Sequence, residues 1–430
     1  MRSGLFRRFD WVLFIDVVLL SLLGLIMVYS AQMRTDNPGM FVAKQSTAFT
    51  IGLAAMLVII NIRYEVYAAY TKYIYIFALI LLVAVLFLGS TVRGSRSWFD
   101  FGKFAFQPSE IAKIALILHL AGYINKNFYV MKRFTKLLPP LFLTLAYVGL
   151  ILLEPDFSSA AVFIPIFIGM VFIGGVSRQL VVLTAVFAAV TVGLPLLSVY
   201  MDVIYPETFL AGNLKIIYFL AVAAGIGAVW MFCRSLRIRV DIKEYKKIIL
   251  ISLLALITGF IITGTLKNYQ KRRILAVMAP SYDPLGAGYN VLQSKIAIGS
   301  GKITGRGLFH GTQSQLGFIP DQHTDFIFAV LAEEGGALAS MGILILYIIL
   351  ILRGLSIARN AADRFGSIIA AGIVIMFSFY IVLNLGMLTG VMPVAGVPLP
   401  FLSYGGSSLI INMIAAGILI NIHMRRYAYT

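Results

Sequence analysis

The sequence predicts an all-α polytopic membrane protein, and two observations support that fold class. First, 60% of the 430 residues are apolar, 12% are charged and the mean hydropathy is +0.93, which lies outside the range of soluble globular proteins. Second, apolar runs of roughly 17–20 residues, the length that crosses a bilayer as a helix, recur along the chain. We therefore expect residues 1–430 to form a single integral membrane domain.

The apolar runs predict about twelve transmembrane helices. These lie near residues 11–30, 43–62, 73–89, 108–124, 137–153, 158–176, 180–199, 212–232, 248–266, 326–352, 367–386 and 407–423. The segment 267–325 is too long and too rich in glycine for a simple connection. We expect it to form one large extracytoplasmic loop.

The distribution of positive charge predicts the orientation of these helices. With the N-terminus inside, the inner connections hold 21 lysines and arginines, whereas the short outer connections hold six. Because such residues concentrate on the cytoplasmic side, both termini are expected in the cytoplasm. The same rule explains the net charge of +17, so we expect no nucleic-acid partner. The single cysteine, Cys233, excludes an internal disulfide.

The stretch 318–336, FIPDQHTDFIFAVLAEEGG, holds four of the 18 acidic residues. Thr324 or Asp325 is expected to cap the helix that follows. Glu333 and Glu334 come about two turns later, roughly 12 Å along that helix. Ionisable residues within a span usually face a partner or a water-filled cavity. The stretch therefore predicts a polar cleft, with Asp325 at its lip and the two glutamates beneath it.

The segment 107–113, QPSEIAK, predicts a helix that begins at Pro108 and Ser109. Glu110 and Lys113 are three residues apart and share one face of that helix. An ion pair that faces the bundle interior is one interpretation. A functional cavity is the other, and it is favoured because each ionisable residue in a span costs roughly 2.5–3.5 kcal/mol on insertion scales.

Three connections have unusual compositions. Residues 90–110 interleave five aromatic side chains with basic residues, which is typical of an interfacial aromatic belt.

Residues 299–307, GSGKITGRG, match neither the Walker nor the dinucleotide-binding pattern. A tight exposed turn and a phosphate cradle of backbone N–H groups are the alternatives. Residues 391–408 contain three prolines and no charge, and such a loop in a membrane packs on protein or lines a cavity. Ser407 and Ser408 are expected to cap the last helix.

Together these segments resemble the SEDS family of cell-wall glycosyltransferases, the RodA, FtsW and SpoVE proteins. The matching pieces are RGSRSWFDFGKFAFQPSEIAK, EPDFSSA, YQKRRI, GAGYNVLQSKIAIGSG, HTDFIFAVLAEEGG and PLPFLSYGGSS, in family order. The resemblance implies polymerisation of lipid II into glycan strands at the outer face of the cytoplasmic membrane. It also implies a class B penicillin-binding protein as transpeptidase partner. The LAEE sequence and the short N-terminal tail favour the RodA-like type, which serves cell elongation and shape.

The resemblance also assigns site residues. The aspartate of the HTDF motif falls on Asp325, which is the predicted catalytic residue. Substrate binding is predicted for Arg96, Glu110, Lys113, Arg273, Gln293, His323, Thr324, Ser403, Gly405 and Gly406. The chain departs from the usual ten spans of the family, because residues 201–266 resemble an insertion with two additional helices. Asp321 stands where the family usually has Glu, and Glu154 where it often has Gln.

The chemistry implied is an inverting glycosyl transfer. Asp325 is expected to be the general base that takes a proton from the attacking sugar hydroxyl. The polyprenyl-pyrophosphate leaving group needs cations, for which Lys113, Arg96, Arg273 and a divalent magnesium or manganese ion are proposed. Glu110 and Asp283 are the candidate metal ligands. Membrane lipid and the polyprenyl tails are expected to lie against the helices.

Three rival functions stay open. A flippase for lipid-linked precursors would also need a polar cleft, although with essential charges near mid-membrane. A division- or sporulation-type polymerase of the same family is the second alternative. A third interpretation, a non-catalytic scaffold for the partner enzyme, predicts that Asp325 is dispensable.

Overall fold

The computed structural model describes residues 8–34, 37–92, 95–100, 102, 105–131, 134–175, 287–392 and 396–426, together with isolated positions between 193 and 264. The chain divides into two compact units. The first unit comprises residues 1–176, 293–389 and 395–430, and contains most of the described elements. The predicted spans near 180–199, 212–232 and 248–266 fall almost entirely outside the described residues.

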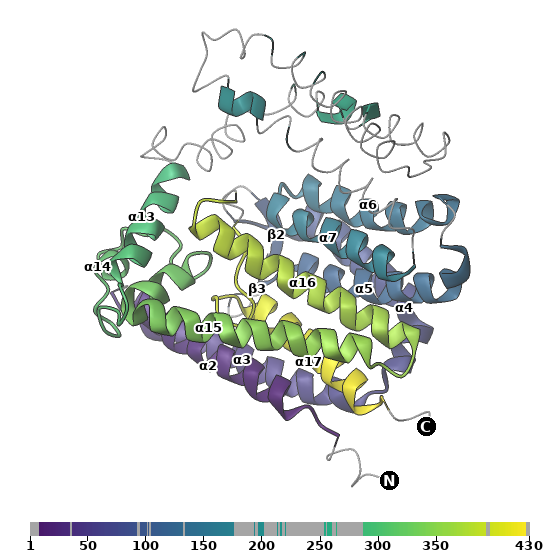
Figure 1. Cartoon of the computed structure of the whole chain (residues 1–430), viewed down its shortest axis with the longest axis horizontal. Helices are drawn as coiled ribbons and strands as arrows, with labels where there is room; N and C mark the ends of the chain where they lie inside the picture. The colour runs from purple at the N-terminus through teal and green to yellow at the C-terminus, as the bar shows by residue number, and fades with distance from the viewer. Residues whose placement is uncertain are drawn as a thin grey trace, which may run out of the picture. The chain divides into compact units, whose positions relative to one another are not determined.

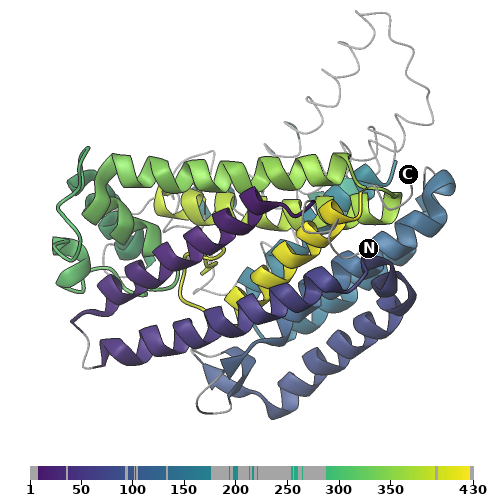
Figure 2. The ribbon, with the colours of Figure 1, turned by 90° about the horizontal axis from the view of Figure 1, so that it is seen from below.

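The first unit is built mainly of helices (Figures 1 and 2). They are α2 (Trp11–Gln32), α3 (Pro38–Asn61), α4 (Tyr64–Leu88), α5 (Pro108–Asn127), α6 (Leu138–Leu153), α7 (Phe157–Ile173), α14 (Thr312–Gln315), α15 (Ile327–Arg359), α16 (Arg364–Leu388) and α17 (Gly406–Met424), with two short 3-10 turns at Phe128–Val130 and Phe134–Lys136. A further helix, α13 (Ala287–Ser300), begins in the second unit and ends in the first. The segment predicted as a long loop, 267–325, thus contains two helices.

Six helices in the described part of the chain are long and apolar enough to cross a membrane. They are α2, α3, α4, α15, α16 and α17. This confirms a mostly helical membrane protein at the coarse level. The number of twelve spans and the cytoplasmic termini remain predictions from the sequence.

The sequence predicted an entirely helical fold. The structure differs in one place, because the aromatic segment after α4 forms a small sheet. Strands β1 (Ser90–Val92), β2 (Ser95–Asp100) and β3 (Ala105–Phe106) pair antiparallel in the order β1-β2-β3. Ser95, Ser97 and Phe99 share one face of β2, and Ser97 is buried there. Aromatic residues favour such a pleated, half-buried surface.

Helix starts follow the sequence signals in two places. Helix α5 begins at Pro108, as predicted, because proline is suited to the first turn of a helix. Helix α7 begins after Asp156, whose side chain accepts a hydrogen bond from the backbone N–H of Ser159. In contrast, α17 starts after Gly405 without a side-chain cap, so the caps predicted from Ser407 and Ser408 were wrong.

Helix α15 packs against α16 and α2, and is broken at Gly336. Gly336 has φ 67° and ψ −165°, a conformation that favours glycine and interrupts the helical hydrogen bonds. The sequence predicted one uninterrupted span. Instead, a short segment from Ile327 leads from the acidic stretch to the break, and a long apolar segment continues to Arg359.

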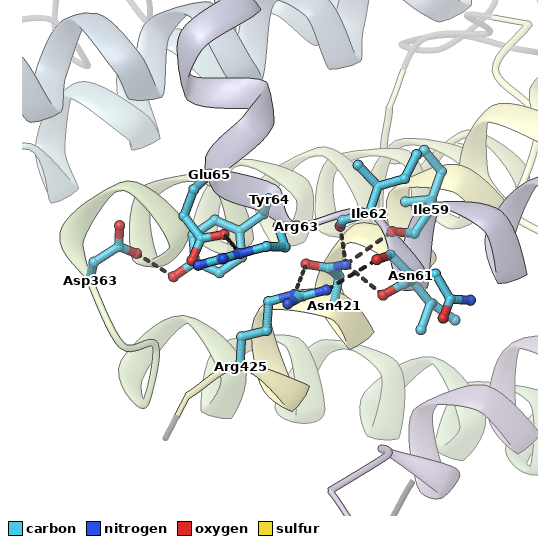
Figure 3. A network of polar contacts seen from close by, with 10 residues as sticks. Ile59, Asn61, Ile62, Arg63, Tyr64, Glu65, Asp363, Asn421 and Arg425 are labelled. Atoms are coloured by element: carbon cyan, nitrogen blue, oxygen red, sulfur yellow. Dashed lines mark hydrogen bonds and ion pairs between the residues drawn. The ribbon is translucent and has the colours of Figure 1, made fainter. Parts of the chain in front are cut away.

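At the predicted cytoplasmic end, polar side chains close the turn between α3 and α4 (Figure 3). The Asn421 side-chain amide of α17 donates hydrogen bonds to the backbone carbonyls of Ile59, Ile60 and Ile62, at 3.0, 2.7 and 2.5 Å. Arg425 donates to the carbonyl of Asn61, which lies between those of Ile60 and Ile62, at 3.2 Å. Asn421 of α17 and Arg425 just after it thus supply donors to carbonyls at the end of α3 that lack partners within the helix.

Candidate active site

Asp325 lies immediately before α15, in the turn that precedes the helix. Its backbone N–H donates to the carbonyl of Asp321 at 3.2 Å, and its own carbonyl accepts a hydrogen bond from the Asn384 side chain at 2.8 Å. Both contacts fix the backbone rather than the carboxylate. The residue as a whole is half-buried.

The Asp325 carboxylate faces Gly396 and the start of α7. A Cβ atom placed on Gly396 would lie 3.3 Å from Oδ2 of Asp325 and 3.7 Å from Oγ of Ser158. Gly396 has φ 61°, which also favours glycine. The structure therefore brings together three of the segments singled out in the sequence: the acidic stretch, the EPDFSSA motif and the proline-rich loop.

The EPDFSSA motif is in turn joined to the start of α5. The Gln107 side-chain amide donates to Oδ2 of Asp156 at 2.8 Å. The same Asp156 carboxylate accepts hydrogen bonds from the backbone N–H and hydroxyl of Ser159, at 3.0 and 2.7 Å. Asp156 thus caps α7 and holds the QPSE motif at the same time, which fixes Ser158 beside Gly396.

Glu110 and Lys113 form a buried ion pair on α5. Lys113 Nζ lies 2.7 Å from Oε1 of Glu110, and their side chains are 1% and 5% exposed. Lys113 Nζ also contacts the hydroxyl of Tyr380 on α16, and lies 4.6 Å from the centre of its ring. A substrate reaches neither charge while this arrangement holds. Their predicted substrate-binding role therefore requires the pair to open.

Asn384 and Tyr380 belong to the site, and the sequence analysis missed both. They lie four residues apart on α16, so they share one face. Asn384 is fully buried, and its amide donates to the carbonyls of Asp325 and Val397 at 2.8 and 2.6 Å. It therefore ties the acidic stretch to the proline-rich loop, while Tyr380 contacts Lys113. The sequence pattern that could have revealed them is a pair of polar residues at helical spacing inside an apolar span.

Glu333 does not line a cleft, which corrects the sequence-based prediction. Its side chain is fully buried, and its Oε1 accepts hydrogen bonds from the backbone N–H of Gln313 at 2.7 Å and the hydroxyl of Thr312 at 3.1 Å. Its Oε2 accepts from the backbone N–H of Ser314 at 3.0 Å. The carboxylate thus satisfies the first turn of α14, as anions do at helix N-termini.

Glu334 is held in the same way by α2. Its Oε1 accepts a hydrogen bond from the Ser30 hydroxyl at 2.5 Å and lies 3.5 Å from the side-chain amide of Gln315. Ser30 lies near the C-terminal end of α2, and Gln315 also donates to its backbone carbonyl. The two glutamates therefore anchor the segment before the acidic stretch to α15 and α2.

The glycine-rich loop is a structural partner of the break in α15. The backbone N–H groups of Arg306 and Gly307 donate to the carbonyls of Glu333 and Glu334, each at 3.0 Å. In the opposite direction, Ala337 and Leu338 donate to carbonyls of residues 302 and 303, at 2.9 and 3.1 Å. The loop thus replaces the missing helical hydrogen bonds. Because these N–H groups are engaged, a phosphate cradle made from them is excluded.

Other predicted residues of the acidic stretch have mainly backbone roles. The carbonyl of His323 accepts from the N–H of Tyr404, and its ring packs against Phe41 and Tyr404. The Thr324 hydroxyl donates to the carbonyl of Asp321 at 3.1 Å. The expected cap by Thr324 or Asp325 was wrong, because Phe326 occupies the N-cap and no side chain caps α15.

The SYGGSS segment is held by α3. Gln45 donates to the carbonyl of Ser403 at 3.2 Å, and accepts from the N–H of Gly405 at 3.1 Å. The Ser403 hydroxyl accepts from the N–H of Leu399 at 2.9 Å, which closes a turn. Gly406 is the first residue of α17. The structure thus gives these residues a packing role and leaves their substrate contacts as predictions.

Of the remaining predicted residues, the structure describes Arg96, Gln293 and Glu110. Arg96 is exposed on β2 and donates to the carbonyl of Leu86 at 3.3 Å. Gln293 is half-buried on α13. Arg273 and Asp283 lie outside the described residues. Within the described part of the chain, no group of three or more His, Cys, Asp or Glu residues could hold a metal ion. Glu110, engaged with Lys113, is a poor ligand, so we derive no step through a metal.

Glu154 is a buried acid in the turn between α6 and α7, outside both helices. Burial raises the pKa of Glu154 to about 8; the nearby negative charge of Asp156 also raises it, whereas a hydrogen bond with Ser97 lowers it. The Glu154 carbonyl accepts a hydrogen bond from Ser95 at 2.7 Å. The side chain is therefore mostly neutral at pH 7, which suits a position where the family often has glutamine.

Comparisons with known proteins identify the family of the chain. The chain matches the model of the FtsW/RodA/SpoVE family, described as cell cycle protein, over residues 10–211 and 214–428. It is 36% identical to the peptidoglycan glycosyltransferase MrdB of Escherichia coli K12, over 96% of this chain and 94% of the relative. It is 34% identical to the peptidoglycan glycosyltransferase RodA of Treponema pallidum, over 97% and 98%.

A solved structure resembles the whole chain. It comes from a peptidoglycan synthase complex, in work on how polymerization and crosslinking are coordinated. The TM-score is 0.68 at 28% identity, and the match covers 97% of this chain and 98% of that one. The fold described above is therefore shared with a known protein over nearly its full length.

Proposed function

Because this chain belongs to the FtsW/RodA/SpoVE family, we propose that it is a peptidoglycan glycosyltransferase that polymerises lipid II for cell elongation. The observation that carries the proposal is the full-length similarity to peptidoglycan glycosyltransferases named MrdB and RodA. The geometry around Asp325 supports it, since it joins three sequence motifs at one half-buried carboxylate.

Asp325 is the proposed general base. A sugar hydroxyl of one lipid-linked disaccharide attacks the anomeric carbon of another, and its proton passes to the Asp325 carboxylate. The bond to the polyprenyl pyrophosphate breaks as the new glycosidic bond forms, so the leaving group carries away the electron pair. A carboxylate acts as a base only with hydrogen-bond reach to the reacting hydroxyl. Gly396 lies close to this carboxylate, since a Cβ atom placed on it would come 3.3 Å from Oδ2.

The chain's own residues position this base. Asn384 holds the backbone at Asp325 and at Val397, the residue after Gly396. Tyr380, one turn away on α16, connects the same helix face to the Glu110–Lys113 pair. We propose that substrate binding opens this pair, so that Lys113 stabilises the pyrophosphate charge. Arg96 and Arg273 are the other proposed cations.

The site is proposed to face the extracytoplasmic side of the inner membrane. The count of positive residues in the connections supports this orientation. A class B penicillin-binding protein is the proposed partner, which is supported by the likeness to a synthase complex that polymerizes and crosslinks peptidoglycan. A flippase is the alternative, and a division- or sporulation-type polymerase is the other.

Purified protein incubated with lipid II tests the proposal directly. We expect glycan chains, separated by length on a gel, from the wild type and none from Asp325→Asn. A flippase would move lipid II across vesicle membranes and would form no chains. Adding EDTA and then magnesium or manganese tests the predicted divalent cation: loss and recovery of polymerisation would support it, and unchanged activity would remove it from the mechanism.

A further inference from the structure

The glycine-rich loop forms an open pocket of about 490 Å³ that has no part in the proposed chemistry. Its lining residues are Ser300, Gly301, Lys302, Thr304, Gly305, Arg306 and His310. The lining contains two permanent cations and no carboxylate. The nearest acids along α15, Glu333 and Glu334, are buried, and their backbones hold the loop. The pocket is therefore suited to an anionic ligand.

The loop holds this pocket in a fixed shape. Four backbone hydrogen bonds join it to both sides of the break in α15. The Arg306 guanidinium donates to the Thr312 hydroxyl at 2.8 Å, which orients it. The His310 ring lies with Nδ1 at 2.7 Å from the carbonyl of Leu308. A preformed charged pocket loses little conformational entropy when a ligand binds.

Apolar side chains continue from the pocket along one face of α15. The hydrogen bond from Leu338 to Ile303 places the exposed Ile303 next to the first member of this row. The row consists of Leu338, Met341, Ile345, Ile348, Leu352 and Leu355, which are 49–62% exposed. Their spacing of three and four residues keeps them on one face. The row is about 26 Å long by helix rise, close to the thickness of a bilayer core.

Aromatic rings mark the level of the pocket in the membrane. Tyr29 on α2 packs edge-on against Phe309 of the loop, with ring centres 5.7 Å apart. Aromatic side chains concentrate at the headgroup level of a bilayer. A cationic pocket at that level, followed by an apolar row, matches a molecule with a negative head and long chains.

We propose that this pocket binds the phosphodiester headgroup of an anionic membrane phospholipid, whose acyl chains lie along the apolar row of α15. Lys302 and Arg306 contact the phosphate, and Ile303 contacts the upper part of the chains. The proposal does not depend on the glycan-polymerase function, because it uses none of the residues around Asp325.

The test compares phospholipid binding by three purified proteins. They are the wild type, the double variant Lys302→Gln/Arg306→Gln, and a control, Lys44→Gln/Lys295→Gln, which removes two exposed charges elsewhere on the predicted outer side. Phosphatidylglycerol and phosphatidylcholine are titrated into each protein in detergent, and bound lipid is counted by native mass spectrometry. We expect phosphatidylglycerol binding to weaken about fivefold for each pocket charge removed, and to stay unchanged in the control.

Further variants keep the result decisive. Lys302→Gln alone leaves the Arg306 contact to Thr312 in place, so it covers the case in which the double variant misfolds. Ile303→Ser should weaken binding of phosphatidylglycerol without affecting binding of inorganic phosphate. Equal binding by the wild type and both pocket variants would overturn the proposal. Binding of inorganic phosphate as tight as that of the lipid would also overturn it. So would a partner's transmembrane helix that binds along the apolar row of α15 and leaves phosphatidylglycerol in place, because the acyl chains would then lie elsewhere.

Discussion

The two ends of the short segment that opens α15 treat their carboxylates in opposite ways. At the start, Asp325 is half-buried, its backbone is fixed by Asn384, and its carboxylate lies close to Gly396. At the end, Glu333 is fully buried, and three hydrogen bonds from α14 satisfy its two oxygens. The two acids lie only eight residues apart.

This difference separates a chemical role from a structural one. Three hydrogen bonds commit the Glu333 carboxylate to the first turn of α14. Asp325 instead lies where the acidic stretch, the proline-rich loop and the start of α7 meet, and a general base must lie within hydrogen-bond reach of its substrate. Substitution at the first position should therefore affect catalysis, whereas substitution at the second should affect stability.

The largest effect is expected from Asp325→Asn, which removes the base and keeps the shape. Loss of a general base costs roughly 10²–10⁴-fold in rate. Polymerisation of lipid II should fall by that factor, while the melting temperature in detergent stays unchanged. Asp321→Asn is the matched control, since asparagine tolerates its positive φ of 52°. Near-normal glycan synthesis by the Asp325 variant would contradict its assignment.

Glu333→Gln should show the opposite pattern. The NH₂ group of the new amide would face N–H donors from which the carboxylate now accepts hydrogen bonds. We expect the free energy of unfolding to fall by about 2–3 kcal/mol. The melting temperature should fall by several degrees, and the rate per folded molecule should change little. Glu65→Gln, in a surface pair with Arg63, is the control and should cost less than about 1 kcal/mol. Loss of rate without loss of stability would place Glu333 in the chemistry.

Glu154 extends the comparison to a buried acid that folding keeps neutral. Its pKa of about 8 in the folded state exceeds the value of 4.5 expected when unfolded. The folded state therefore binds more protons between these values, and stability is lost as pH rises through this window. The contribution from this group should fall by about 2 kcal/mol between pH 5 and pH 7. Glu154→Gln should flatten that dependence in melting curves; a parallel pH profile would contradict this account.

Gly396→Ala should have the smallest effect, and it tests the space beside Asp325. The added methyl group would lie 3.3 Å from Oδ2 and compete with the substrate hydroxyl. We expect a rate loss of about tenfold, or about 1.4 kcal/mol. Gly317→Ala is a close control, because it has a similar φ of 72° with nothing within 4 Å of the added atom. Equal losses in both variants would show that backbone strain alone is responsible.

Much of the helical fold and the positions of the motifs could be predicted from the sequence. Runs of apolar residues predicted α2 to α7, α16 and α17 because the bilayer imposes their length and composition. The break at Gly336 could not be predicted, since its hydrogen bonds come from a loop about 30 residues earlier. The same limit applied to Glu333, whose partners on α14 lie 20 and 19 residues earlier in the chain.

The candidate site was only partly predictable for a related reason. The family motifs pointed to Asp325, but helix periodicity placed the glutamates beneath it on one continuous helix. Asn384 was overlooked because its partners are backbone carbonyls on two other segments, which no local pattern reveals. Contacts of this type become visible only when the chain is folded.

The Asn421 amide, which holds three carbonyls of the α3–α4 turn, has a consequence for reading such sequences (Figure 3). An interrupted helix in a bilayer exposes acceptors that lipid cannot satisfy, so a neighbouring helix must carry a donor at the same depth. Asparagine is short, uncharged and rich in N–H, which makes it the least costly donor in an apolar helix. Of the two asparagines in α17, Asn421 thus marks the adjacent α3–α4 turn, whereas Asn412 donates to Ser408 in its own helix.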